Sequence, residues 1–172
     1  MAFYLKLAVI VRFGKDREWE LPFVEESLSR LGAPQDESRF IFCDSSKSGV
    51  VKEKAFSLGE QWGEFLYIPF EPVVGKEKER PRKYSYVMAR LMNQAVTATR
   101  NAPFIFTLDS DTLLPTPEEL KGEKVLPRMM KAMGPDVAVV GSSVPSRHRE
   151  QINPSVYRMD SIEPFSGFHY AS

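Results

Sequence analysis

The sequence is poor in the residues that form disulfides and bind soft metals. Its 172 residues include one cysteine and two histidines. A single cysteine excludes an internal disulfide framework and suits a reducing compartment. Its place in the apolar run 40–43 indicates a buried thiol rather than a nucleophile. Because the two histidines and Cys43 stand far apart in the sequence, a zinc site is a poor fit.

Long apolar runs and an excess of charge of one sign are also absent. No stretch approaches the roughly 18 apolar residues of a membrane span. The first residues lack the basic region and apolar segment of a signal peptide. The 23 basic and 23 acidic residues give a formal net charge of zero, so charge implies neither a nucleic-acid nor a membrane partner. We therefore expect a cytosolic (cytoplasmic) protein.

Glycine-rich phosphate loops are missing as well. A Rossmann dinucleotide site needs several glycines after the first strand, and the turn 13–17 holds only Gly14. No glycine-rich run ends in Gly-Lys-Ser/Thr, which disfavours a P-loop. With both glycine-rich loops disfavoured, a divalent ion held by carboxylates is the remaining way to bind a phosphate group.

The chain does contain a regular alternation of apolar segments. Its length and its 42% hydrophobic and 27% charged residues fit one soluble globular domain over 1–172. The pattern predicts an α/β fold: a single-domain, mainly parallel sheet with helices on both faces. Strands are predicted at 4–13, 39–43, 64–70, 104–108 and 137–141, and helices at 21–31, 50–58 with an extension to 62, 84–99, and from 116 or 117 to about 133, the last broken at Pro127 and ended by Gly134.

Two aspartates follow the fourth predicted strand. The run 104–108 is short, apolar and rich in β-favouring residues, which is typical of a buried parallel strand. Asp109 and Asp111 stand at or just past its carboxyl end, where ligands bind in open α/β sheets. Two carboxylates this close suit a hard cation such as Mg²⁺ or Mn²⁺. Taken alone, an Asp-Ser-Asp sequence is more often a turn.

Other polar groups are predicted near these aspartates. Parallel order brings the ends of the first, second and fourth strands to one edge of the sheet, which adds 12–15 and Asp44 to the set. Upstream of the third long helix, Arg82 and Lys83 are placed to neutralise a diphosphate that shares the metal. A solvated, mixed-charge loop is the alternative interpretation of these two residues.

Three stretches carry a resemblance to a known family: LAVIVRFGKDREWELPFVEESLSRL, FIFCDSSKSG and RLMNQAVTATRNAPFIFTLDSDT. They resemble the GT-A-fold glycosyltransferases of the inverting family 2 type, whose Rossmann-like fold is that of the nucleotide-diphospho-sugar transferases. The resemblance covers about 4–141, which would form a nucleotide-sugar-binding core.

The resemblance implies roles for individual residues. Asp44 would contact the nucleotide base. Asp109 and Asp111 would hold Mn²⁺ or Mg²⁺ and the diphosphate of a UDP- or GDP-sugar. The backbone turn at Arg12 and Phe13 would pack on the nucleoside.

The helix before the metal-binding strand departs from the family pattern. The family usually shows Ala-Arg-Asn there. Asn93 takes the asparagine position only if one residue is inserted later, and Met92 then replaces the arginine. Arg90 or Lys83 would supply the missing charge.

The segment 142–172 is expected on the acceptor side of the site. Its run 166–170 resembles the start of the family's acceptor region, and family members usually continue further. Asp160 and Glu163 are the acids available as general base, and His169 is an alternative base or a third metal ligand. A minimal enzyme, a truncated enzyme and a GT-A-like domain without transfer activity all fit this ending.

We therefore expect a metal-dependent, inverting glycosyltransferase that moves a sugar from a nucleotide-diphosphate sugar to an acceptor. A nucleotidyltransferase of similar topology is a second hypothesis. Such enzymes usually have a glycine-rich, basic loop after the first strand, and the pair 14–15 offers only a fragment of one. A non-catalytic, GT-A-like domain that binds a nucleotide sugar is the third hypothesis.

Overall fold

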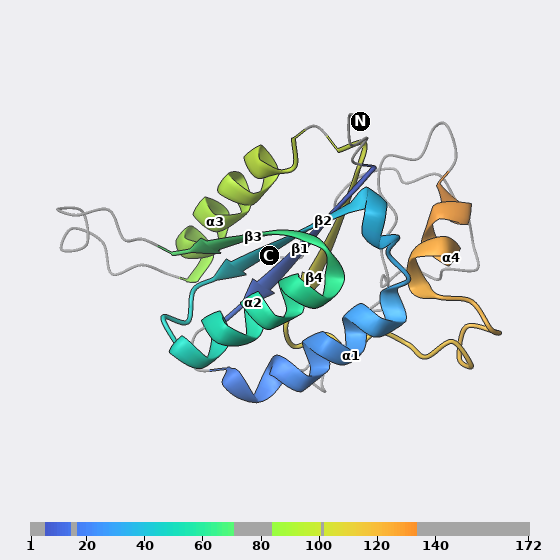
Figure 1. The fold of residues 1–172 in the computed structure, drawn as a ribbon, viewed down its shortest axis with the longest axis horizontal. Coiled ribbons are helices and arrows are strands. Elements are labelled where there is room, and N and C mark those ends of the chain that lie inside the picture. Colours follow the sequence, from blue (N-terminus) through green and yellow to red (C-terminus); the bar gives the residue numbers. More distant parts are fainter. Residues whose placement is uncertain (1–5, 15–16, 71–83, 101, 134–172) are drawn as a thin grey trace, which may run out of the picture.

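The core of the protein is a parallel sheet between two layers of helices (Figure 1). The computed structural model describes residues 6–14, 17–70, 84–100 and 102–133. Within these residues the sheet has four strands in the order β3-β2-β1-β4, and each neighbouring pair is parallel. The predicted α/β class with a parallel sheet is confirmed. The strands are β1 (Leu7–Phe13), β2 (Ser38–Asp44), β3 (Glu64–Pro69) and β4 (Phe104–Asp109).

Helices cover both faces of this sheet, as the alternating sequence pattern predicts (Figure 1). One face packs on α1 (Leu21–Leu31) and α2 (Gly49–Trp62), with α4 (Val125–Ala132) joining the same core. The other face packs on α3 (Tyr84–Ala98). Two short 3-10 turns, η1 (Glu18–Glu20) and η2 (Gln35–Glu37), precede α1 and β2.

Side-chain alternation along β1 fills both cores. Val9, Val11 and Phe13 join the core beneath α1 and α2, whereas Ala8 and Ile10 join the core beneath α3. Because successive side chains point to opposite faces, a strand covered on both sides must be apolar, as residues 7–11 of β1 are. Arg12, the one half-buried residue of β1, comes next to its carboxyl end.

Local signals set the ends of α1. Pro22 lies in its first turn, where its missing N–H removes no helical hydrogen bond. Gly32 follows the last residue with φ of 76°, a left-handed conformation that glycine adopts without steric cost. A Cβ at Gly32 would lie 2.7 Å from the Cβ of Lys124, so the glycine also lets the segment before α4 approach.

The last predicted helix is corrected by the structure. Residues 117–122 form turns, and α4 begins only at Val125. Gly122, with φ of 87°, and Lys121, with φ of 57°, take left-handed conformations that no α-helix continues through. Pro127 does not break a helix either, because it lies in the first turn of α4, where backbone N–H groups have no helical partner. The predicted strand 137–141 and Gly134 lie outside the described residues.

The fourth strand is less buried than the sequence predicts. Leu108 is buried, but Ile105 is 45% exposed, and exposure alternates along β4. Among the described strands β4 is one of the two edge strands, and α3 packs mainly over β2 and β3 instead. One face of β4 therefore lacks cover from the described elements. Of the helices in this part of the chain, none is long and apolar enough to cross a membrane.

Candidate functional site

The carboxyl ends of β1, β2 and β4 meet at one edge of the sheet. The strand register places Arg12 beside Asp109 of β4, and Phe13 beside Asp44 of β2. Asp111 follows two residues after β4 ends. The structure thus brings most of the described sequence-predicted residues to one edge of the sheet.

The two strand-end aspartates leave the sheet on opposite faces. Asp44 continues the side of β2 that carries Phe42, which packs beneath α1 and α2. Asp109 shares the face of Arg12, the side on which α3 lies. A nucleotide bound by both carboxylates would therefore have to reach across the end of β1, which lies between β2 and β4 in the sheet.

Asp109 forms an ion pair with Arg12, its neighbour in the strand register. Its carboxylate remains partly exposed. The Nε atom of Arg12 is buried and has no hydrogen-bond partner among the described residues. The backbone around the pair is fixed, since the Ser110 N–H donates to the Arg12 carbonyl at 3.0 Å and the Thr112 N–H to the Asp109 carbonyl at 3.0 Å.

Asp111 binds a different arginine. Arg17 Nη1 donates to Asp111 Oδ2 at 2.9 Å and to Glu20 Oε1 at 3.0 Å. Glu20 is fully buried, and its other oxygen accepts a hydrogen bond from the Ser110 hydroxyl. One buried carboxylate therefore holds both the guanidinium at Asp111 and the serine between the two aspartates. Sequence reasoning missed Arg17 and Glu20, because both precede α1 in what reads as an ordinary polar turn.

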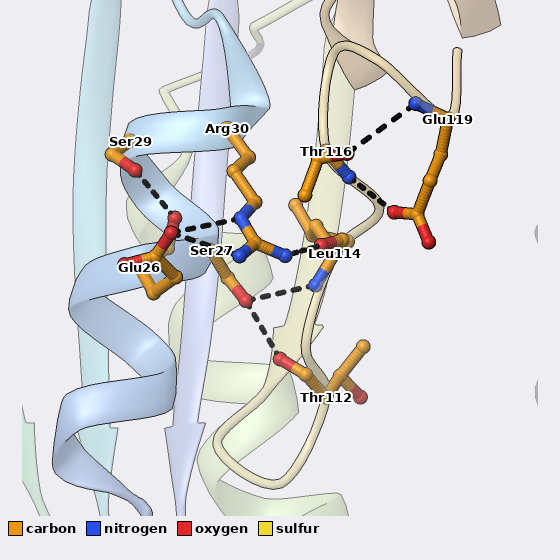
Figure 2. A network of polar contacts seen from close by, with 8 residues as sticks. All are labelled: Glu26, Ser27, Ser29, Arg30, Thr112, Leu114, Thr116 and Glu119. Carbon is orange, nitrogen blue, oxygen red and sulfur yellow. Dashed lines mark hydrogen bonds and ion pairs between the residues drawn. The ribbon is translucent and has the colours of Figure 1, made fainter.

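The segment after the aspartates is fastened to α1 (Figure 2). The Ser27 hydroxyl donates to the Thr112 carbonyl at 2.8 Å and accepts from the Leu114 N–H at 3.0 Å. Arg30 Nη1 donates to the Leu114 carbonyl at 2.6 Å. Ser27 is buried on α1, so the helix supplies the polar partners that an extended segment needs. These bonds fix the exit of the Asp109–Asp111 segment, as Glu20 fixes its middle.

A reciprocal pair of hydrogen bonds closes the next turn. The Thr116 N–H donates to Glu119 Oε2 at 2.7 Å, and the Glu119 N–H donates to the Thr116 hydroxyl at 3.3 Å (Figure 2). This is the capping-box arrangement that often starts a helix. The capping box is consistent with the helix that the sequence predicts from 116 or 117, but here the chain continues as a turn.

Asp44 is almost completely buried and already carries several donors. The Ser46 N–H donates to Oδ1 at 2.7 Å, and the Tyr67 hydroxyl donates to Oδ2 at 2.6 Å. Burial, followed by the hydrogen bond to Asp44 and the charge of that carboxylate, raises the pKa of Tyr67. Phe13 is also buried, and its ring stacks on Phe42. A base contact at Asp44 stays a prediction, and it would have to replace or share these partners.

The remaining sequence-predicted residues lie on α3 or outside the described residues. α3 runs from the carboxyl edge of the sheet to its amino edge, because its last residue, Ala98, accepts a hydrogen bond from Arg39 at the start of β2. Arg90 is half-buried and Asn93 is exposed, both in the middle of this helix. The other predicted residues fall outside the described part of the chain: Arg82, Lys83, Asp160, Glu163 and His169.

The donor set at this edge fits a divalent ion that is shared with phosphate. No group of three or more histidine, cysteine, aspartate or glutamate side chains that would hold a metal occurs within the described residues. Mg²⁺ does not need one, since it usually takes one or two carboxylates and completes its shell with water and substrate phosphates. Asp109 and Asp111 supply two such carboxylates, each now paired with an arginine.

Cys43 confirms the expectation of a buried thiol. It is fully buried under α3, and burial raises its pKa to about 12, an effect that the charge of Arg12 partly offsets. At pH 8 we expect the native protein to resist iodoacetamide, because a rise from 9.0 to about 12 lowers the thiolate fraction roughly a thousandfold. Mass spectrometry after alkylation would show one added group in urea and none in buffer. Alkylation in buffer at the rate seen in urea would contradict the buried position.

The same thiol makes folding sensitive to alkaline pH. Because the pKa of Cys43 is higher in the folded than in the unfolded chain, its contribution is intact below pH 9 and is lost progressively as the pH rises toward 12. Cys43→Ala should therefore flatten the loss of stability above pH 9.

Together, the fold and the strand-end carboxylates define an α/β protein with a Rossmann-like parallel sheet and a polar carboxyl edge. No protein-family model matches the chain, and no curated protein matches it. Among solved structures it is similar to residues 1–349 of TarS from S. aureus, a glycosyltransferase, at 18% sequence identity and a TM-score of 0.43. The likeness covers 67% of this chain and only 30% of that one.

Proposed function

We propose that this chain is a metal-dependent glycosyltransferase domain that binds a nucleotide-diphosphate sugar at the carboxyl edge of its sheet. The observation that carries the proposal is the Asp109-Ser110-Asp111 segment, which follows β4 and is bonded into the fold on both sides. Open α/β sheets bind ligands at this edge. Paired carboxylates there suit a hard cation and the diphosphate that would share it.

The residues at this edge would divide the work of binding. Asp109 and Asp111 would hold Mn²⁺ or Mg²⁺, and the ion when bound would supply Lewis-acid stabilisation of the diphosphate leaving group. Asp44 and the tyrosine hydroxyl bonded to it form a polar pair near the end of β2, on the side where the base would bind. Asp160, Glu163 and His169 remain the candidates for the base that deprotonates an acceptor hydroxyl in an inverting transfer.

The two arginine pairs do not prevent the metal from binding. Arg12 with Asp109 and Arg17 with Asp111 are partly exposed pairs, and such pairs contribute about 1 kcal/mol or less. A divalent ion that brings a diphosphate with it offers a stronger interaction to the same carboxylates. The arginines, once displaced, lie beside the incoming anion.

Calorimetric titration with UDP and GDP, with and without Mn²⁺, tests this proposal. Asp111→Ala should weaken Mn²⁺-dependent nucleotide binding by about tenfold or more, because a charge-assisted contact typically accounts for at least that factor. Asp36→Ala is the matched control, since Asp36 is exposed in η2 at the opposite edge of the sheet. Equal binding by Asp111→Ala and wild type, or no nucleotide binding by wild type, would sink the proposal.

Product analysis separates the transfer reactions. Incubation with a nucleotide sugar and Mn²⁺ should release free UDP or GDP if glycosyl transfer or hydrolysis occurs. Release of pyrophosphate from a nucleoside triphosphate and a sugar 1-phosphate, in a parallel incubation, would instead indicate nucleotidyl transfer. Binding without any product in either incubation would indicate a non-catalytic domain.

A further inference from the structure

We propose that Arg17 is a diphosphate-binding residue that occupies Asp111 until a metal ion takes its place. The inference rests on the proposed function and adds a residue to it. It predicts that Arg17 weakens the binding of the metal ion alone but strengthens the binding of the metal ion together with its anion.

The two carboxylates that Arg17 binds differ in their exposure to solvent. Its side chain is 35% exposed, and the same Nη1 atom binds Glu20 and Asp111 at nearly equal distances of 3.0 and 2.9 Å. Glu20 has no solvent exposure and is fixed from its other side by the Ser110 hydroxyl. Asp111 is partly exposed at the edge of the sheet. Glu20 is therefore the anchor of the guanidinium, and Asp111 is the partner that a ligand from solvent can reach.

A metal ion and the guanidinium compete for Asp111. Two cations close to one carboxylate repel each other, so an ion at Asp111 drives Arg17 away from that oxygen. The buried charge of Glu20 keeps the guanidinium nearby after the exchange. Arginine carries five N–H donors in a planar fork that matches phosphate oxygens. Its freed N–H groups then lie beside the metal's anionic partner.

Among the described residues, Arg12 has no such second anchor. It pairs with Asp109 directly across the strand register, and no buried carboxylate in this part of the chain is bonded to it as well. Arg82 and Lys83, the cations chosen from the sequence, lie outside the described residues. Among the cations that the structure describes at this edge, Arg17 alone combines a partly exposed carboxylate partner with a buried one.

Titration of Arg17→Gln with two probes tests the inference. Mn²⁺ alone should bind several-fold more tightly than to wild type, because its competitor at Asp111 is gone. Inorganic pyrophosphate in saturating Mn²⁺ should bind about tenfold more weakly, because a charge-assisted contact is lost. Loss of a purely structural support would weaken binding of both probes. The opposite signs are therefore the signature of the exchange.

Two further variants complete the experiment. Arg17→Lys keeps the charge that opposes Mn²⁺ but loses the planar fork, so it should bind Mn²⁺ as wild type does and pyrophosphate more weakly. It also gives a second measurement should Arg17→Gln fail to fold, which circular dichroism would reveal. Arg100→Gln is the matched control, because Arg100 is exposed between α3 and β4, at the amino edge of the sheet. Both affinities should be unchanged in Arg100→Gln.

The outcomes separate this inference from the proposed function. If UDP with Mn²⁺ binds wild type and both Arg17 variants equally, the role of Arg17 is overturned and the proposed function stands. If pyrophosphate binding depends on Arg17 but no nucleotide or nucleotide sugar binds, the anion site stands and the proposed function fails. If Arg17→Gln changes the affinities for Mn²⁺ and for pyrophosphate in the same direction, the exchange of Arg17 for the metal at Asp111 is overturned. If wild type binds neither probe, both proposals are overturned.

Discussion

Replacing Phe42 by alanine is expected to lower the free energy of unfolding by about 3–5 kcal/mol, the usual range for a large aromatic side chain in a core. Phe42 has no solvent exposure. Its ring stacks on Phe13 at a centroid distance of 6.1 Å and meets Phe65 edge-on at 6.3 Å. The truncation removes these contacts and leaves a cavity between the sheet and the layer of α1 and α2. Urea denaturation followed by circular dichroism measures the loss.

Phe56→Ala is the matched control for this prediction. The ring of Phe56 lies 5.5 Å, centroid to centroid, from those of Phe65 and Tyr67, but Phe56 is 39% exposed. Its truncation should cost less than half as much, because water already reaches part of the ring and no closed cavity forms. Equal losses in the two variants would show that Phe42 is not the central packing residue of this sheet face.

The helices and strands of this fold are readable from the sequence because their signals are local. Apolar residues run without interruption over 7–11 of β1 and 40–43 of β2, as strands covered on both faces require. Pro22 and Gly32 mark the first turn and the end of α1 by backbone rules that need no tertiary context. The predicted bounds of α1 are therefore confirmed at both ends, and those of α3 come within one residue of the structure. The helix α2 begins one residue before the predicted start and runs to Trp62, the end of the predicted extension rather than of the predicted core 50–58.

The last described helix shows where local signals mislead. Thr116 and Glu119 form the reciprocal bonds of a helix start, but the chain then takes left-handed conformations at Lys121 and Gly122. The glycine was visible inside the predicted helix. Only the packing of Val125 and Leu126 into the core beneath α1 determines that α4 starts after it.

The partners of the strand-end aspartates were beyond local reasoning. Arg17 and Asp111 are 94 positions apart, and Ser110 and Glu20 are 90 apart. Their meeting depends on which strand lies beside β1, and the sequence does not state that neighbour. The position of the aspartates at a strand end was predictable, whereas the arginines that bind them were not.

Glu20→Ala is expected to destabilise the fold by roughly 3–5 kcal/mol, because truncating a fully buried side chain leaves a cavity and leaves its hydrogen-bond donors without this acceptor. Within the described part of the chain, Arg17 would keep its bond to Asp111, and the Ser110 hydroxyl would lose its acceptor. Glu20→Gln is the conservative comparison. It preserves the shape and one oxygen acceptor but removes the charge, so its cost should be smaller, about 1–3 kcal/mol. Urea denaturation of the two variants measures both values.

The two Glu20 substitutions should affect ligand binding at the site as well as the stability of the fold. If Glu20 holds the Asp109–Asp111 segment through Ser110 and Arg17, both variants should also weaken Mn²⁺-dependent pyrophosphate binding at temperatures where they remain folded. The reason is that Arg17 would lose the charge that keeps it beside the anion after Asp111 is taken. A Glu20→Ala protein with nearly wild-type stability and undiminished pyrophosphate affinity would show that Glu20 anchors neither Arg17 nor the Asp109–Asp111 segment. The proposed exchange at Asp111 would then lose its physical basis.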